Sequence, residues 1–392
     1  MSRRRHDVRA STALAALALV LSACSGSDDD ETAAPPPPAE STAPVAPSTP
    51  AESEPSDTPA TPTTPAVGPD ARARVTETLA TGLDTPWGIA FLPDGSALVS
   101  LRDSGRIVRV PAEGGGAEPV GEVAAASAEG TQEGGLLGIA LHPDYPSEPW
   151  LYAYYTAGSE NQLARMRYDG GALGRPQVLL DDVDAAAFHN GGRIGFGPDG
   201  MLYVATGDGT DRESAQDDND LNGKILRLTP EGEAAPDNPT SGSPVYSTGH
   251  RNIEGIAWDE SGQLWASEFG DQQWDELNRI EPGANYGWPQ QEGEGGGSGL
   301  VDPVVQWSTD EASPAGVAIV GGAAYVAALR GERLWQVPLD GGEPRALFTG
   351  DYGRLRTVAL APDGSLWLTT SNKDGRGDPA GNDDRVLRVT LS

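Results

Sequence analysis

Several side chains able to move protons or bind anions stand at equivalent places in a repeated segment of this sequence. They comprise one histidine, two carboxylates and four arginines: His189, Asp208, Glu268, Arg251, Arg330, Arg354 and Arg356. An imidazole paired with a carboxylate can accept a proton, because the carboxylate fixes its tautomer and stabilises the imidazolium. Arginine binds carboxylates through two parallel hydrogen bonds. If gathered together, these side chains would suit proton abstraction beside a bound polyanion.

The repeated segment is a pair of short alternating strands joined by a turn of the Pro-Asp-Gly type. Its six copies begin at Gly88, Gly138, Arg193, Gly255, Gly316 and Thr357. Two antiparallel strands joined by a short turn place the residue before the first strand and the residue after the second at the same end. Six such units around one axis would therefore bring the reactive side chains to one rim.

The repeat predicts an all-β fold, a six-bladed β-propeller of four-stranded antiparallel sheets over residues 71–392. The copies lie 41 to 62 residues apart, close to the length of one four-stranded blade with its loops. A further strand follows several copies, and these segments are expected to be third or fourth strands: 106–110, 224–228, 276–280, 333–337 and 385–389. Residues 72–83 are expected to complete the last blade and close the ring, which removes an open sheet edge. A β-sandwich would not explain the sixfold repeat.

The N-terminus is typical of an export signal. Basic residues precede an apolar run, 13–21, that is too short to span a membrane as a helix. The run ends in Leu-Ser-Ala-Cys, which resembles the lipobox of bacterial lipoproteins, so residues 1–23 are a predicted signal peptide and Cys24 a predicted lipidation site. The alternative is an ordinary signal peptide with an incidental cysteine. Residues 24–70, rich in Pro, Thr, Ser and Ala, are a predicted disordered linker. We therefore expect an exported lipoprotein that faces outside the cytoplasm.

The chain is strongly acidic, with 58 acidic and 27 basic side chains and a formal net charge of −31. This field disfavours nucleic acids and anionic lipid surfaces as partners. A local cluster of arginines is informative against such a background. Arg354 and Arg356 are two residues apart, so on an extended segment they project to the same side. The alternative is that the arginines pair with the surplus carboxylates.

The third copy carries the candidate base. His189 precedes it and Asp208 follows it, so the two can face each other across the rim. His142 lies inside a Pro-Asp turn, where a structural role is expected. For His189 alone the base and structural roles are equally plausible, and its arrangement opposite Asp208 favours the base.

The fourth copy carries a candidate cation site. Arg251 and Asn252 precede it and could bind a carboxylate or a carbonyl oxygen. The loop at 267–271 combines a carboxylate with a glycine turn, and oxygen-rich loops of this kind suit Ca²⁺, although most are only turns. Further along, Asp275, Glu276 and Tyr286 could hold a second, structural ion.

Four motifs, taken in order, resemble the soluble quinoprotein aldose sugar dehydrogenases, relatives of soluble glucose dehydrogenase. They are FHNGGRIGFGPDGMLYVATGDG, GHRN, SEFGDQQWDELN and NYGWP. The resemblance covers about residues 75–392. It implies binding of pyrroloquinoline quinone (PQQ), a tricarboxylated ortho-quinone, together with Ca²⁺.

The resemblance also implies roles for individual residues around the reacting atoms. His189 would be the general base that takes the proton of the anomeric hydroxyl, and Asp208 the carboxylate that orients it. Arg251 and Asn252 would contact the cofactor, with Arg251 near the reactive quinone oxygen. Glu133 occupies the place of a polar residue that faces substrate or cofactor.

Three more arginines correspond to the family's anchors for the cofactor. Arg354 and Arg356 match its paired arginines on the PQQ carboxylates, and Arg330 stands where the family has a lysine. The first blade departs from the family's pattern, because it lacks the glutamate expected before Arg102.

The implied calcium ligands come from two loops. The backbone carbonyls of Gly270 and Asp271 match the ligands of the cofactor-associated Ca²⁺, while Glu276 and Tyr286 match positions around a structural Ca²⁺. Asp271 replaces a more usual proline, which is harmless if only its carbonyl binds.

The reaction implied by the resemblance is oxidation of an aldose sugar at C1 to a lactone, by hydride transfer to the quinone and then to an unidentified electron acceptor. Two other functions remain open at this stage. One is a calcium-dependent lactonase-type hydrolase, which would not need several arginines. The other is a non-catalytic propeller lipoprotein that binds a ligand.

Overall fold

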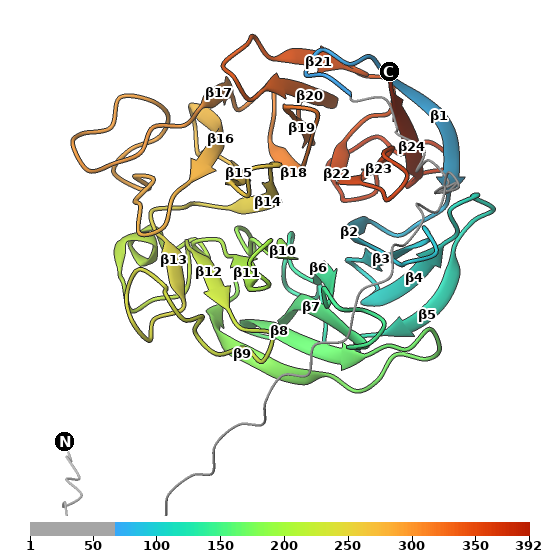
Figure 1. Ribbon diagram of the computed structural model, residues 1–392, viewed down its shortest axis with the longest axis horizontal. Coiled ribbons are helices and arrows are strands. Elements are labelled where there is room, and N and C mark those ends of the chain that lie inside the picture. The colour runs from blue at the N-terminus through green and yellow to red at the C-terminus, as the bar shows by residue number, and fades with distance from the viewer. Residues whose placement is uncertain (1–66) are drawn as a thin grey trace, which may run out of the picture. The chain divides into compact units, whose positions relative to one another are not determined.

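The computed structural model describes residues 67–392, which form six four-stranded antiparallel sheets around a central axis (Figure 1). The predicted six-bladed β-propeller is confirmed. Cys24, the predicted signal peptide and nearly all of the predicted linker lie outside the described residues.

The first three blades follow one another along the chain, each running outward from its innermost strand. The first contains β2 (Pro86–Phe91), β3 (Ala97–Leu101), β4 (Arg106–Val110) and β5 (Glu118–Glu122). The second contains β6 (Leu136–Leu141), β7 (Trp150–Ala157), β8 (Glu160–Arg167) and β9 (Gln177–Asp184). The third contains β10 (Ile194–Phe196), β11 (Leu202–Ala205), β12 (Ile225–Leu228) and β13 (Val245–Ser247).

The remaining blades have the same order of strands, except that the last borrows its outer strand from the N-terminal side. The fourth contains β14 (Ile253–Trp258), β15 (Leu264–Glu268), β16 (Trp274–Ile280) and β17 (Val305–Ser308). The fifth contains β18 (Pro314–Val320), β19 (Ala323–Ala328), β20 (Arg333–Pro338) and β21 (Arg345–Leu347). The sixth contains β22 (Leu355–Leu360), β23 (Leu366–Thr370), β24 (Val386–Leu391) and β1 (Ala73–Ala80). All five segments expected to be third or fourth strands are third strands.

Strand β1 closes the ring as predicted. It pairs antiparallel with β24, with Ala73 opposite Leu391 and Val75 opposite Val389. The last blade is thereby made from both ends of the described chain (Figure 1). This pairing covers the edge that β24 would otherwise expose.

The turns between the first and second strands of four blades share one device. An aspartate side chain in each accepts a hydrogen bond from the backbone N–H two residues later, at 2.9 to 3.1 Å: Asp94, Asp199, Asp259 and Asp363. Such a bond stabilises the reversal of the chain locally. The Asp-containing turns of the sequence therefore account for the hairpins that carry the site at their opposite end.

The innermost strands crowd one another around the axis, and glycine makes this possible. A Cβ at Gly138 of β6 would collide with the carbonyl oxygen of Gly192, and one at Gly255 of β14 with that of Ala315. The apolar core lies farther out, between adjacent blades, where side chains such as Leu98, Ile107 and Tyr155 are almost fully buried.

Helix is almost absent from residues 67–392. The one assigned helix there is a 3₁₀ turn, η1 (Arg212–Gln216), between β11 and β12. Within this part of the chain there is no helix with the length and apolar character that a membrane crossing requires.

Candidate active site

His189 and Asp208 form the pair that the third copy predicts. His189 Nδ1 lies 2.7 Å from Asp208 Oδ1, and the carboxylate is fully buried while the imidazole is partly exposed. Burial alone would raise the pKa of the Asp208 carboxyl, but its hydrogen bonds, first of all that with His189, outweigh burial and lower the pKa. An ionised carboxylate only accepts hydrogen bonds, so Nδ1 donates its hydrogen and Nε2 is left as the proton acceptor.

The second oxygen of Asp208 is also held. Trp288 donates its indole N–H to Oδ2 at 2.8 Å, and the backbone N–H of Thr210 donates to Oδ1 at 2.8 Å. Fixed on both oxygens, the carboxylate can hold the imidazole in one tautomer and one orientation.

The backbone around His189 is fixed as tightly as its ring. His189 has a φ of 60°, a left-handed conformation that is uncommon outside glycine. Its N–H donates to Oε2 of Glu133 at 2.9 Å. Asn252 accepts the N–H of Gly191 at 2.9 Å, so this predicted cofactor contact also anchors the His189 loop.

A cavity of about 380 Å³ opens at the same end of the blades. Its lining residues either precede or begin an innermost strand or follow the second strand of a blade. These are the two positions that an antiparallel hairpin brings to the same end. The lining residues include four arginines and two glutamates: Arg330, Arg354, Arg356, Arg376, Glu133 and Glu254. The lining therefore has an excess of two positive charges in a chain whose net charge is −31.

Two of these arginines are buried and paired with carboxylates. Arg354 donates from Nε to Oδ2 of Asp374 at 2.9 Å, and Arg356 donates from Nη1 to Oε2 of Glu254 at 2.6 Å. Arg356 Nη2 also lies 3.6 Å from Asp374, so both arginines project to one side as predicted. Burial would raise the pKa of the Asp374 carboxyl, but the charges of Arg356 and Arg354 outweigh it and lower that pKa.

Arg354 and Arg356 therefore pair with carboxylates, which was the alternative prediction, and they also line the cavity. Burial raises the pKa of the Glu254 carboxyl, against the opposing effect of Arg356. Arg330 differs because its side chain is 59% exposed and pairs with Asp310 at the rim.

Arg251 lies beside Trp288 rather than in the cavity lining. Its guanidinium carbon is 5.4 Å from the indole ring centre, and Nη2 is 3.4 Å from Oδ1 of Asp271. Its Nε is buried and makes no hydrogen bond within residues 67–392. Asp271 also pairs with Arg212 of η1 at 2.9 Å, so this departure from the family's proline has contacts of its own.

Three of the predicted calcium residues meet around one small void. Gly270, Glu276 and Tyr286 all line it, together with Glu268 and others, and its volume is about 10 Å³. Asp271 is not among the lining residues. Residues 67–392 contain no cluster of three or more His, Cys, Asp or Glu side chains arranged to hold a metal ion. A cation there would depend on backbone carbonyls as well as carboxylates, as the sequence predicts.

The carboxylates at this void are tightly constrained. Glu276 accepts the N–H of Gly293 at 2.7 Å, and Asn278 donates to both Glu276 and Glu268, at 3.0 and 3.2 Å. Burial, and after it the charge of Glu268, raises the pKa of the Glu276 carboxyl above its ordinary value. The Tyr286 hydroxyl donates to Arg279 O at 2.7 Å, so its carbonyl is the group left to serve a cation.

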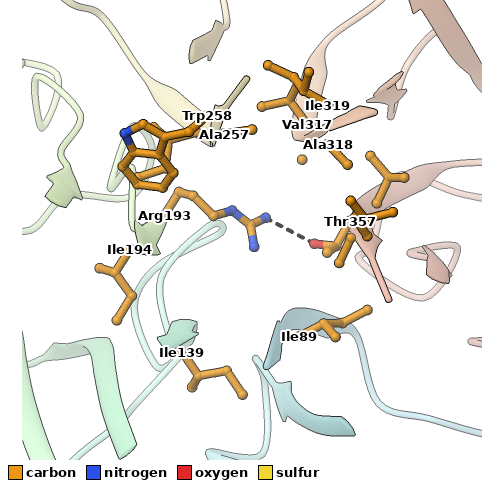
Figure 2. A pocket seen from close by; sticks show the side chains of 15 residues that line it. Ile89, Ile139, Arg193, Ile194, Ala257, Trp258, Val317, Ala318, Ile319 and Thr357 are labelled. Atoms are coloured by element: carbon orange, nitrogen blue, oxygen red, sulfur yellow. Dashed lines mark hydrogen bonds between the residues drawn. The ribbon is translucent and has the colours of Figure 1, made fainter. Parts of the chain in front are cut away.

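A second cavity, of about 270 Å³, lies on the axis and is lined mainly by residues of the innermost strands (Figure 2). Its walls are mainly aliphatic, including Ile89, Ile139 and Ile319. Arg193 is its one charged lining residue, and it donates to Thr357 Oγ1 at 3.0 Å and to Glu254 O at 2.7 Å. This cavity has no proton acceptor suited to catalysis, so the candidate site is the cavity at the His189 end.

Sequence reasoning missed four residues of the site: Glu254, Trp288, Asp374 and Arg376. The last two follow the second strand of the sixth copy, so the rule that found Asp208 and Glu268 would also have found them. Trp288 belongs to the NYGWP motif but carried no predicted role. Glu254 stands at the start of a strand, where a buried acid gave no separate signal.

Comparisons with known proteins show which family the chain resembles. The family model described as glucose/sorbosone dehydrogenase matches residues 83–380. The PQQ-bound structure of aldose sugar dehydrogenase from Streptomyces coelicolor is 54% identical with a TM-score of 0.80, and the match covers 83% of this chain and 100% of that chain. Aldose sugar dehydrogenase of Escherichia coli is 29% identical over 339 residues, 76% of this chain and 90% of the relative. Quinoprotein glucose dehydrogenase B of Acinetobacter calcoaceticus is 30% identical over 259 residues, 57% of this chain and 54% of the relative.

Proposed function

The chain belongs to the glucose/sorbosone dehydrogenase family, and from this premise we propose that it is a PQQ- and Ca²⁺-dependent enzyme that oxidises aldose sugars at C1 to lactones. The observation that carries the proposal is the His189–Asp208 pair together with a cavity lined by four arginines; neither member of the pair lines the cavity, but Glu133, which does, accepts the His189 N–H.

The residues present fit PQQ. The cavity volume of about 380 Å³ lies within the range of roughly 300–1,000 Å³ usual for small-molecule sites. The arginines offer several N–H donors to a polycarboxylate, and guanidinium forks match carboxylates well. The buried Nε of Arg251, which lacks a partner among the described residues, points to a missing acceptor. Arg330, Arg354 and Arg356 would hold the cofactor from the cavity lining, and Arg251, which lies outside that lining, would supply a further donor.

Calcium would be held by the carbonyls of Gly270 and Asp271 near the cofactor, with Glu276 and the Tyr286 carbonyl as ligands of a structural ion. Hard cations prefer such oxygen ligands. Bound there, Ca²⁺ would supply positive charge next to Arg251 and rigidify the loop after β15.

His189 takes the proton in the proposed reaction. Because Nδ1 is committed to Asp208, Nε2 is the nitrogen left to accept a proton, and it would remove the proton of the anomeric hydroxyl as the C1 hydrogen leaves with its electron pair. Asp208 stabilises the imidazolium that forms. Arg251, placed by Glu268 and Trp288, would stabilise negative charge that develops nearby. PQQ, when bound, supplies the two-electron oxidant that accepts the hydride.

A hydrolase would have no use for a cavity that presents four arginines.

The direct test is to titrate the purified full-length chain with PQQ and Ca²⁺ and then to assay aldose-dependent dye reduction. We expect saturable PQQ binding and turnover on at least one aldose of a broad panel. Absence of PQQ binding would overturn the proposal, and binding without turnover on any sugar would favour the non-catalytic ligand-binding alternative.

We also propose that the protein is exported and held on the outer face of the cell membrane by a lipid on Cys24. The motif Leu-Ser-Ala-Cys supports this. Metabolic labelling with a radioactive fatty acid should mark the wild-type chain but not Cys24→Ala. Labelling that is absent from the wild type would refute the anchor.

A further inference from the structure

Arg376 enters the cavity from the loop between β23 and β24. Its Nη1 lies 2.9 Å from Oε1 of Glu133, and its guanidinium carbon is 5.6 Å from the ring centre of Phe188. Glu133 and Phe188 flank the second and third blades, whereas Arg376 belongs to the sixth. The contact therefore joins opposite parts of the rim.

The loop that presents Arg376 is held firmly. Asp374, whose Oδ2 binds Arg354, accepts the backbone N–H of Arg376 on its other oxygen at 3.0 Å. Asn372 donates its side-chain N–H to Asp383 at 3.1 Å. A Cβ at Gly377 would come within 2.6 Å of Asn372 O, so the loop packs closely there. One carboxylate thus sets the positions of both a predicted cofactor anchor and Arg376.

Glu133 joins Arg376 to the proposed base. Its Oε1 faces Arg376, while its Oε2 accepts the backbone N–H of His189 at 2.9 Å. The Glu133 side chain is only 17% exposed. His189 has a φ of 60°, so a fixed acceptor for its N–H helps to hold a conformation that the residue does not favour by itself.

From this geometry we propose two roles that rest on the proposed function. Arg376 is a further anion-binding residue that contacts a carboxylate of the bound cofactor directly. Glu133 is a positioning residue that aims Arg376 and fixes the His189 backbone. A guanidinium has five N–H donors, and the recorded contact joins only Nη1 to Glu133, so others remain to face an anion.

An ordinary surface ion pair would look different. Arg167 and Asp169 illustrate one, because they lie 3.9 Å apart and both side chains are 63% exposed. Arg376 instead lines the cavity, lies against an aromatic ring and pairs with a carboxylate that is already committed to the His189 backbone.

The test of Arg376 measures PQQ binding to the Ca²⁺-loaded, PQQ-free full-length protein by tryptophan fluorescence quenching. Arg376→Gln should raise the Kd about tenfold, the loss expected for one charge-assisted hydrogen bond. Arg376→Lys should give an intermediate Kd, because it keeps the charge and loses the fork. Arg167→Gln, which removes the same charge away from the cavity, should leave the Kd within about twofold of wild type.

The outcomes separate this inference from the proposed function. If the wild type binds PQQ and Arg376→Gln binds it equally well, Arg376 is not a ligand-binding residue and the proposed function stands. If the wild type does not bind PQQ, the proposed function itself fails. The Tm of the PQQ-free Arg376→Gln protein should stay within about 2 °C of wild type, since the side chain is 42% exposed. A larger fall would assign Arg376 to the fold instead.

Glu133 is tested by comparing two substitutions at saturating PQQ. Glu133→Gln keeps an oxygen acceptor for the His189 N–H and should retain kcat within about threefold, whereas Glu133→Ala removes the acceptor and should lower kcat about tenfold. KM for the sugar should change little in either variant. Equal kcat in the two variants would rule out the positioning role.

Discussion

Trp288 donates its indole N–H to Oδ2 of Asp208 at 2.8 Å, and through that carboxylate it reaches His189. Trp288 and Asp208 are 80 positions apart in the sequence and come from different blades. The same indole lies against the guanidinium groups of Arg251 and Arg212, at 5.4 and 4.8 Å. One aromatic side chain therefore positions both the carboxylate behind the proposed base and a proposed cofactor-binding cation.

Replacing this indole should impair turnover more than folding. Trp288→Phe keeps an aromatic ring but leaves Asp208 Oδ2 without its donor, which should cost about 1 kcal/mol in the free energy of unfolding. We expect kcat to fall about tenfold, because Asp208 would hold the imidazole less rigidly. The measurement is kcat together with urea unfolding of the same preparation.

Trp265 offers a matched control for this substitution. It also donates its indole N–H to an aspartate, Asp259 Oδ2, at 3.1 Å, but in the turn at the opposite end of a blade. Trp265→Phe should lose a similar amount of stability and keep kcat. If the two variants lost kcat equally, the link between Trp288 and the base would be wrong.

The exposed cavity arginine should contribute to PQQ binding alone, whereas the two buried arginines should contribute to both binding and stability. Arg330→Ala removes an exposed side chain, so it should weaken PQQ binding about tenfold with little change in Tm. Replacing both Arg354 and Arg356 by alanine leaves Asp374 and Glu254 buried and unpaired, which should also destabilise the protein by about 3 kcal/mol or more. Calorimetric titration with PQQ and thermal unfolding would check both. An unchanged Kd in Arg330→Ala would remove that residue from the site.

Calcium binding should depend on the Glu276 carboxylate and not on the Asp271 carboxylate. Glu276→Gln removes a proposed ligand and should raise the Ca²⁺ concentration needed for half-maximal thermal stabilisation about tenfold. Asp271→Asn keeps the backbone carbonyl and should shift that concentration by less than about twofold. The reverse order of effects in a Ca²⁺ titration would contradict the ligand assignment.

Lys224 should make stability depend on pH in the alkaline range. Its ammonium is buried and donates to Ser214 O and Asn222 O, at 2.6 and 2.8 Å, and burial lowers its pKa from 10.5 to about 8. Between these two values the unfolded chain holds the proton and the folded chain has lost it. The contribution of Lys224 to the free energy of unfolding should therefore rise with pH from about 8 towards 10.5.

Urea unfolding of the wild type and of Lys224→Met across this interval isolates that contribution. The free energy of unfolding of the wild type minus that of Lys224→Met should increase with pH above pH 8, because methionine cannot titrate. Parallel profiles would show that Lys224 keeps its proton on folding.

The repeat predicted the blade architecture because each hairpin carries its own strand alternation and its own turn, which in four blades is held by an aspartate side chain. The closing strand at 72–83 and the common side of Arg354 and Arg356 followed from the same local geometry. The pairing of His189 with Asp208 followed because both flank one hairpin.

The rest of the site depends on loops from different blades, which no local period encodes. Glu254 meets Arg356 across 102 residues, and Trp288 meets Asp208 across 80. Glu292 is a further example, because its Oε1 accepts four consecutive backbone N–H groups, from Asp271 to Trp274, and so shapes the loop after β15. Its position within a glycine-rich stretch gave no sign of that role.

The central claim is that His189 takes the substrate proton, and single-turnover reduction of the PQQ-loaded enzyme by an aldose in His189→Asn tests it most directly. Asparagine tolerates a positive φ and can still donate to Asp208, but it has no atom in place of Nε2. We predict a Kd for PQQ within about twofold of wild type and a reduction rate between about 10²- and 10⁴-fold lower. A reduction rate equal to that of the wild type would contradict the assignment of His189 as the base.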